Sequence, residues 1–285
     1  MKKLLAIILC LLVLAGCAET YDGPTELKSV LASTEESHYD VEGHVYETLW
    51  TDYSYDIYGR LAMEVTTRND EPSLKTVYRY YEDGSMKSCT QYDLSGWFPR
   101  LILHAKYTYD AQGRNTSLVQ WSSWEKMEQV TTYDDEARTV TTVVDGARTV
   151  MHLDEEGRPL RSETVFDDGT TDLQEHEYRD NSKITRCYLN GELDRVWEYS
   201  YDDQGRELEW YETKDGVRKL IRRYEYGDGH DICHNELAGK IITTGYNEDG
   251  TVKAIRETDA QGRIIRTEIN RRTDIRVPAE EGATP

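Results

Sequence analysis

The stretch YSYDDQGRELEWYE (residues 199–212) alternates aromatic and polar residues, breaks at Asp-Asp-Gln-Gly-Arg, and then alternates again. Such alternation places successive side chains on opposite faces of a β-strand, and the acidic, glycine-containing break is typical of a turn. Related stretches occur elsewhere, as YSYDIYGRLAMEV (53–65), YTYDAQGRNTSLV (107–119) and DAQGRIIRTEI (259–269). The sequence therefore predicts one β-hairpin that recurs along the chain.

The spacing of these turns predicts how the hairpins are joined. From residue 113 onward the turns are centred on residues 113, 137, 157, 181, 205, 229 and 250, which gives steps of 20 to 24 residues. Shorter turn signals lie between them, at Asp145-Gly146, Asp168-Gly169, Asn190-Gly191 and Asp215-Gly216. Asp-Gly and Asn-Gly favour the type I′ turn, because both central residues need a positive φ. Each repeat is therefore expected to be strand, turn, strand, turn, which makes an all-β antiparallel meander.

The residues of the Asp-x-x-Gly-Arg turn each have a physical role. The Asp carboxylate is expected to accept backbone N–H groups of the turn, and Gly takes the left-handed conformation. The Arg then begins the next strand, where it can pair with carboxylates or stack on a Tyr of a neighbouring repeat. Ala137 and Ser182 replace the Gly in two degenerate copies, so these two turns are expected to differ.

The motif resembles the YD repeat of the RHS family, whose signature is a Tyr-Asp-x-x-Gly-Arg-Leu hairpin. Matching copies begin at Tyr55, Tyr109 and Tyr201, and the resemblance covers most of residues 38–270. It implies that the hairpins form one long twisted sheet that coils. Large members of the family enclose a toxin and cleave themselves, but residues 263–285 do not resemble the segment that does so. YYEDGSMKS (80–88) and YNEDGTVKAIRE (246–257) are also similar to MORN-type repeats.

The first residues, MKKLLAIILCLLVLAGC (1–17), resemble a bacterial lipoprotein signal. Lys2 and Lys3 precede an apolar segment that is too short to span a bilayer, and small residues precede Cys17. The resemblance implies acylation of Cys17 and location in the cell envelope, outside the cytoplasm; the alternative is an ordinary secretory signal. The expected organisation is a signal peptide (1–16), a lipidated Cys and acidic tether (17–37), the repeat domain (38–270) and a disordered tail (271–285).

Charge and cysteine content limit the classes of partner. The formal net charge is −20. A chain this acidic is expected to bind nucleic acid poorly, because phosphate contacts need clustered Lys and Arg. Such a charge either keeps the protein soluble or attracts cations and basic partners. Cys89, Cys187 and Cys233 remain beyond the signal, an odd number at wide spacing, so no disulfide framework is implied.

Candidate chemistry is sparse. GDGHDICHNE (227–236) offers His230, Cys233 and His234 as weak metal ligands, although an irregular turn with a buried Cys is the favoured interpretation. No Gly-x-Ser-x-Gly, P-loop or dinucleotide fingerprint occurs. We therefore expect no cofactor and no enzymatic activity, and a hydrolase with acidic residues in a groove is the least favoured alternative.

The remaining signal is aromatic: 21 Tyr and 6 Trp against only 2 Phe. Strand parity places Trp197, Tyr199 and Tyr201 on one face, and predicts that Trp210 continues it. Tyr107 and Tyr109 form a similar pair. Such a face suits binding of a glycan or a surface protein. The alternative is that Tyr and Trp are the core of a thin sheet in a structural envelope protein without a ligand.

Overall fold

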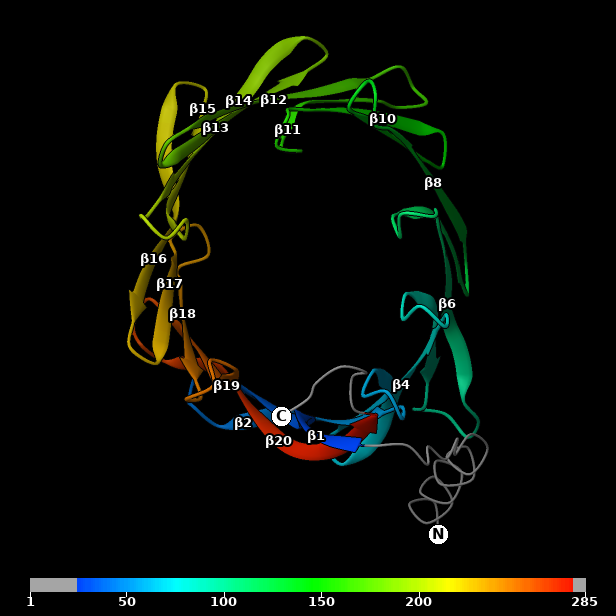
Figure 1. The fold of residues 1–285 in the computed structure, drawn as a ribbon. Helices are drawn as coiled ribbons and strands as arrows, with labels where there is room; N and C mark the ends of the chain where they lie inside the picture. The colour runs from blue at the N-terminus through cyan, green and yellow to red at the C-terminus, as the bar shows by residue number, and fades with distance from the viewer. Residues whose placement is uncertain (1–24, 279–285) are drawn as a thin grey trace. The chain divides into compact units, whose positions relative to one another are not determined.

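The computed structural model describes residues 25–278, and all regular secondary structure in this range is β-strand (Figure 1). Twenty strands follow one another as an antiparallel meander, as the sequence predicted. No helix in the described part of the chain is long and apolar enough to cross a membrane. The chain divides into two compact units: unit 1 contains residues 25–104, 251–256 and 264–278, and unit 2 contains residues 105–250 and 257–263.

Unit 1 brings the first and last strands together. Strand β1 pairs antiparallel with β2 over one part of its length and with β20 from Thr25↔Pro278 to His38↔Arg266 (Figure 1). The strands of this unit are β1 (Thr25–Tyr39), β2 (Val45–Tyr55), β3 (Leu61–Arg68), β4 (Glu71–Tyr80), β5 (Met86–Asp93) and β20 (Ile264–Pro278). Strands β2 to β5 pair in chain order.

This pairing changes two expectations. Residues 25–37, expected in the tether, belong to β1, and residues 271–278, expected in the tail, belong to β20. They form strands because each supplies the backbone partners of the other. A strip that only coils leaves its first and last strands unpaired with each other, so that part of the predicted fold is wrong. Residues 1–24, including the predicted signal and Cys17, lie outside the described range.

Unit 2 is a run of hairpins in register. Its strands are β7 (Asn115–Ser122), β8 (Lys126–Asp134), β9 (Thr139–Val144), β10 (Ala147–Leu153), β11 (Pro159–Val165), β12 (Thr171–Arg179), β13 (Ser182–Leu189), β14 (Glu192–Tyr201), β15 (Glu207–Lys214), β16 (Val217–Gly227), β17 (His230–Asn235) and β18 (Lys240–Tyr246). Each pairs antiparallel with the next. Strands β6 (Arg100–Tyr109) and β19 (Val252–Asp259) contain the divisions between the units.

The Asp-x-x-Gly-Arg turns have the predicted chemistry. Asp202 Oδ1 accepts hydrogen bonds of 2.9 Å from the backbone N–H groups of Gln204 and Arg206, and Oδ2 accepts one of 2.7 Å from Arg206 Nε. Gly205 has φ +76°. The same set recurs at Asp56, Asp110, Asp154 and Asp259. In the copy with Ala137, Arg138 takes the left-handed conformation instead, with φ +53°.

The shorter turns follow the prediction with one exception. Both central residues have a positive φ at Asp145-Gly146, Asn190-Gly191 and Asp215-Gly216, as a type I′ turn requires. At Asp168-Gly169 only the glycine does. There Gly169 N–H donates to Phe166 O and Phe166 N–H to Thr170 O, so the turn has the backbone hydrogen bonds of the Asp-x-x-Gly turns with Phe166 in place of the Asp. The Asp168 carboxylate accepts the backbone N–H of Thr170.

The hydrophobic core is small. Only Val30, Ala105, Cys187, Ile221 and Val277 are buried apolar residues in the described range. Side-chain pairs across neighbouring strands must therefore carry much of the stability. These pairs bring the candidate site together.

Candidate functional site

The predicted aromatic face is present in unit 2. Trp197, Tyr199 and Tyr201 lie on β14, and Trp210 lies on β15, where it is the register partner of Tyr199. The register shifts by one residue near Leu208, so the face continues through an irregularity. All four aromatic side chains are half-buried. The predicted shared face is therefore confirmed for Tyr199 and Trp210.

Tyr107 and Tyr109 are placed elsewhere. Both are half-buried on β6, whereas the face just described is built on β14 and β15. The structure thus groups the first four predicted aromatic residues and leaves this pair on another strand.

A row of aromatic and cationic side chains crosses five strands of this face. Successive register partners are Tyr178 on β12, Lys183 on β13, Tyr199 on β14, Trp210 on β15 and Arg222 on β16. We call these five residues the aromatic–cationic row. Sequence reasoning found only Tyr199 and Trp210, because the positions of the other three depend on the register of each hairpin.

The row is held together by ring and cation contacts. Lys183 Nζ lies 5.6 Å from the Tyr178 ring centroid and 5.8 Å from that of Tyr199. The rings of Tyr199 and Trp210 stack with centroids 5.7 Å apart and an interplanar angle of 16°. Arg222 Cζ lies 5.3 Å from the Trp210 ring centroid. The rings of Tyr199 and Trp210 therefore have neighbours against their faces.

Two donors in the row lack an acceptor. Trp210 Nε1 and Arg222 Nε are buried and have no hydrogen-bond partner among residues 25–278. A buried donor left unpaired costs about 1–3 kcal/mol. By contrast, the indole of neighbouring Trp197 donates to Glu212 Oε2 at 3.2 Å. The row therefore contains two adjacent side chains that each have one N–H group without an acceptor.

Burial shapes the ionisation of this face. It raises the pKa of Tyr199 to about 12, so this hydroxyl stays protonated at neutral pH. Burial lowers the pKa of Lys183. It also raises the pKa of Glu207, against the opposing effect of Arg222. Tyrosine hydroxyls, an indole N–H, an amine and a guanidinium together make the row rich in donors.

The weak metal candidates do not come together. Strand β17 alternates, so His230 and His234 point to one side and Cys233 to the other. His234 Nε2 lies 3.0 Å from Glu225 Oε1, and His230 Nδ1 lies 3.3 Å from Asp228 O. In the described range, the one group with metal-ligand spacing is the exposed set Asp40, Glu42 and His44 on the β1–β2 turn.

The three thiols are unpaired. Cys89, Cys187 and Cys233 are all free, and Cys187 is buried. Burial raises the pKa of Cys187 to about 11. This position favours an inert packing role over reactivity.

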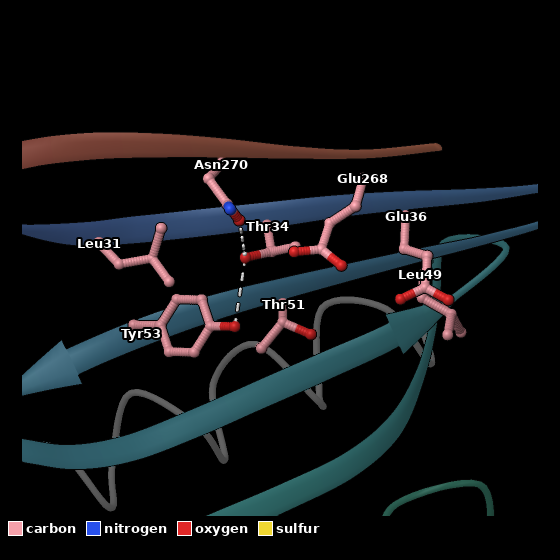
Figure 2. Close-up of a pocket in the computed structure, with 8 residues that line it drawn as sticks. All are labelled: Leu31, Thr34, Glu36, Leu49, Thr51, Tyr53, Glu268 and Asn270. Carbon is pink, nitrogen blue, oxygen red and sulfur yellow. Dashed lines mark hydrogen bonds between the residues drawn. The ribbon is translucent and has the colours of Figure 1, made fainter. Parts of the chain in front are cut away.

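Unit 1 contains a separate pocket of about 270 Å³. It is lined by alternate residues of β1, β2 and β20, mostly polar (Figure 2). Sequence reasoning missed it, because residues such as Thr34 and Asn270 meet across 236 positions. No local pattern signals a contact of that range.

Three exposed aromatic residues were also missed. Trp97 and Phe98, in the turn between β5 and β6, are 80% and 83% exposed, and Trp124, between β7 and β8, is 89% exposed. They lie in turns, outside the alternating strand pattern. Aromatic residues within a Ser- and Gly-containing turn are the signal that would have found them.

Comparisons with known proteins give weak likenesses. No protein-family model matches the chain, and no curated protein matches it. A TcdB2-TccC3 crystal structure matches with 14% identity and a TM-score of 0.35, over 80% of this chain and 15% of that one. A porin-like protein from Bacteroides uniformis matches with 11% identity and a TM-score of 0.27, over 85% of this chain and 96% of that one.

The periplasmic gluconolactonase of Pseudomonas aeruginosa matches with 9% identity and a TM-score of 0.18. The match covers 87% of this chain and 100% of that one. The chain thus spans about 15% of the length of the TcdB2-TccC3 chain. The structure itself therefore shows an all-β meander whose unit 2 has a donor-rich row of aromatic and cationic residues on one face.

Proposed function

We propose that this protein is a lipid-anchored binding module of the cell surface, without enzymatic activity, that holds a glycan on the aromatic–cationic row. The observation that carries the proposal is the pair of unused donors, Trp210 Nε1 and Arg222 Nε. Glycan hydroxyl, ring and carboxylate oxygens are the acceptors that such donors need. Both nitrogens are buried, so a ligand that reaches them must displace the side chains that cover them; it then removes the cost of leaving them unpaired.

The shape of the row suits an extended ligand. Neighbouring strands lie about 4.8 Å apart, so five strands extend across roughly 20 Å, the length of several sugar units. The row places Tyr, Lys, Tyr, Trp and Arg on successive strands. Tyr and Trp supply rigid contact area at low entropic cost, which favours their use in binding surfaces.

The anchor would hold this module close to a membrane. If Cys17 is acylated, the residues between it and Thr25 extend over at most about 29 Å. The acylation of Cys17 is part of the proposal, because it rests on the sequence pattern. Loss of detergent partitioning in a Cys17→Ser variant is the expected result.

A glycan-binding screen on the full chain tests the binding role. We expect saturable binding to at least one extended glycan, weakened about tenfold in Trp210→Phe, which keeps an aromatic ring and removes the indole donor. Trp124→Phe is the matched control, because Trp124 is exposed on a turn outside the row. Equal binding of the two variants, or binding to no glycan, contradicts the proposal.

A structural role without a ligand is the second candidate. It is favoured by the ring stacking within the row, which occupies the faces of Tyr199 and Trp210. On this account, Trp210→Phe lowers the free energy of unfolding and no glycan binds. The same screen, combined with thermal unfolding of the variant, separates the two candidates.

A further inference from the structure

The pocket of unit 1 carries an inference that is independent of the aromatic–cationic row. Two register rows line it: Asn270, Thr34 and Thr51 form one, and Glu268, Glu36 and Leu49 form the other. In Figure 2, Glu268 and Thr51 lie between Tyr53 on one side and Glu36 with Leu49 on the other.

The hydroxyl protons of Thr34 and Tyr53 are already used. Thr34 Oγ1 donates to Asn270 Oδ1 at 2.9 Å, which spends its single proton. Its 3.2 Å contact with Tyr53 Oη must then run the other way, with the tyrosine donating. Asn270 Oδ1 and the Tyr53 oxygen therefore offer only lone pairs to the pocket. Thr51 shares a hydrogen bond of 2.9 Å with Thr66.

The second row adds acceptors and negative charge. Glu36 and Glu268 face each other across β1 and β20, and both contact Arg266 Nη1, at 3.2 Å and 3.1 Å. Glu36 Oε1 also lies 2.6 Å from His38 Nε2. An ionised carboxylate has no proton to donate. One guanidinium between two carboxylates leaves an excess of negative charge when the imidazole is neutral.

The vacant hydrogen-bonding capacity of the pocket is thus mainly that of acceptors, which calls for a ligand rich in donors. Leu31 and Leu49 supply apolar surface on the same lining. The volume of about 270 Å³ falls just below the size range typical of ligand pockets, so the ligand is small. The net charge of −20 also raises the local concentration of cations.

We infer that this pocket binds an alkylammonium group, with the N–H donors of a primary amine directed at Glu268, Tyr53 and Asn270 and its methylenes against the leucines. A free aliphatic diamine and the side chain of a partner's lysine share this chemistry. No covalent step is involved.

Isothermal titration calorimetry of the full chain with 1,4-diaminobutane tests the inference. We expect one saturable site per chain, weakened about tenfold in Glu268→Gln. Glu163→Gln is the matched control: it makes the same change of charge at an exposed site in unit 2, where Glu163 pairs with Arg161. Tyr53→Phe removes one acceptor without changing the charge, and should weaken binding severalfold. If Glu268→Gln does not fold, the binding of 1,4-diaminobutane to Tyr53→Phe tests the inference in its place.

A donor-free ligand separates the pocket from diffuse attraction. The fully N-methylated analogue keeps both positive charges and loses every N–H, so it should bind at least tenfold more weakly. Equal binding of the analogue, or equal weakening by Glu268→Gln and Glu163→Gln, overturns the inference. Tighter binding of 1,4-diaminobutane than of Nα-acetyl-lysine amide assigns the site to a free amine. The reverse order assigns it to a lysine side chain, and failure of both to bind rejects the site.

Discussion

The guanidinium of Arg206 lies 4.2 Å from the ring centroid of Tyr226, and the Tyr226 hydroxyl donates a 2.6 Å hydrogen bond to the carbonyl of Glu207, the residue after that arginine. The same arrangement joins Arg60 to Tyr80 and Arg114 to Tyr133. A cation–π contact and a hydrogen bond thus join each of these turns to the tyrosine of the next copy. The Arg-to-Tyr stacking predicted from the motif is confirmed.

Removing the tyrosine hydroxyl should weaken the contact between the turn and the next copy. We expect Tyr226→Phe to lower the free energy of unfolding by about 1 kcal/mol, because one hydrogen bond is lost. Tyr226→Leu should cost roughly 0.5–1 kcal/mol more, since the cation–π contact is also lost. Urea unfolding measures both. Tyr46→Phe is the control, because the Tyr46 ring is exposed. If Tyr46→Phe and Tyr226→Phe lower the free energy of unfolding equally, this account of the turn is contradicted.

Two glycines in identical turns should respond differently to alanine. Gly59 and Gly205 have φ of +73° and +76°, so each substitution costs about 1–2 kcal/mol of backbone strain. A Cβ at Gly59 would also lie 2.8 Å from Val277 Cγ1, whereas one at Gly205 meets nothing within 4 Å. Gly59→Ala should therefore destabilise unit 1 by about 1–3 kcal/mol more than Gly205→Ala destabilises unit 2.

Chemical unfolding of the two glycine variants measures the difference. Equal losses would show that β20 does not pack on the β2–β3 turn as described. A larger loss in Gly205→Ala would contradict the packing outright.

Stability should fall in acid because of the turn aspartates. Backbone hydrogen bonding to Arg206 holds the pKa of Asp202 below its usual value, and Thr170 does the same for Asp168. A depressed folded-state pKa contributes stability above the unfolded value of about 3.9, and that stability is lost as pH falls through the folded value. The melting temperature should therefore drop below about pH 4. The drop in melting temperature should be smaller in Asp202→Asn than in the unmodified protein. Identical dependence of melting temperature on pH in the two proteins would contradict the role given to Asp202.

Cys187 should resist modification in the folded protein. Burial raises its pKa to about 11, so almost no thiolate exists at pH 8. Mass spectrometry after brief alkylation should show Cys187 unmodified in buffer and modified in denaturant. Rapid labelling of Cys187 under native conditions would contradict its buried position.

The repeat, the strands and the turn chemistry were predictable from sequence because they are local. The Asp carboxylate and the groups that it binds lie within four residues of one another, so the motif contains its own geometry. The pairing of β1 with β20 was not predictable. Residues 25–37 lack the alternating aromatic pattern, and their partners lie at the other end of the chain.

The candidate site was predictable only in part. Parity identified the face of Tyr199 and Trp210, but Lys183 and Arg222 join it through register. The register shift between Trp210 and Tyr211 decides which residue of β16 faces the indole. One residue of slippage would place Ile221 there instead of a cation.

The claim that the row binds a glycan is tested most directly at the Trp210 indole. With ¹⁵N-labelled tryptophan, the indole N–H signals of the six Trp residues can be followed by NMR, and Trp210→Phe identifies the relevant one. Saturation with the glycan from the screen should shift the Trp210 signal and slow its exchange with water, while Trp124 stays unchanged. An unmoved Trp210 signal at saturation would contradict the account.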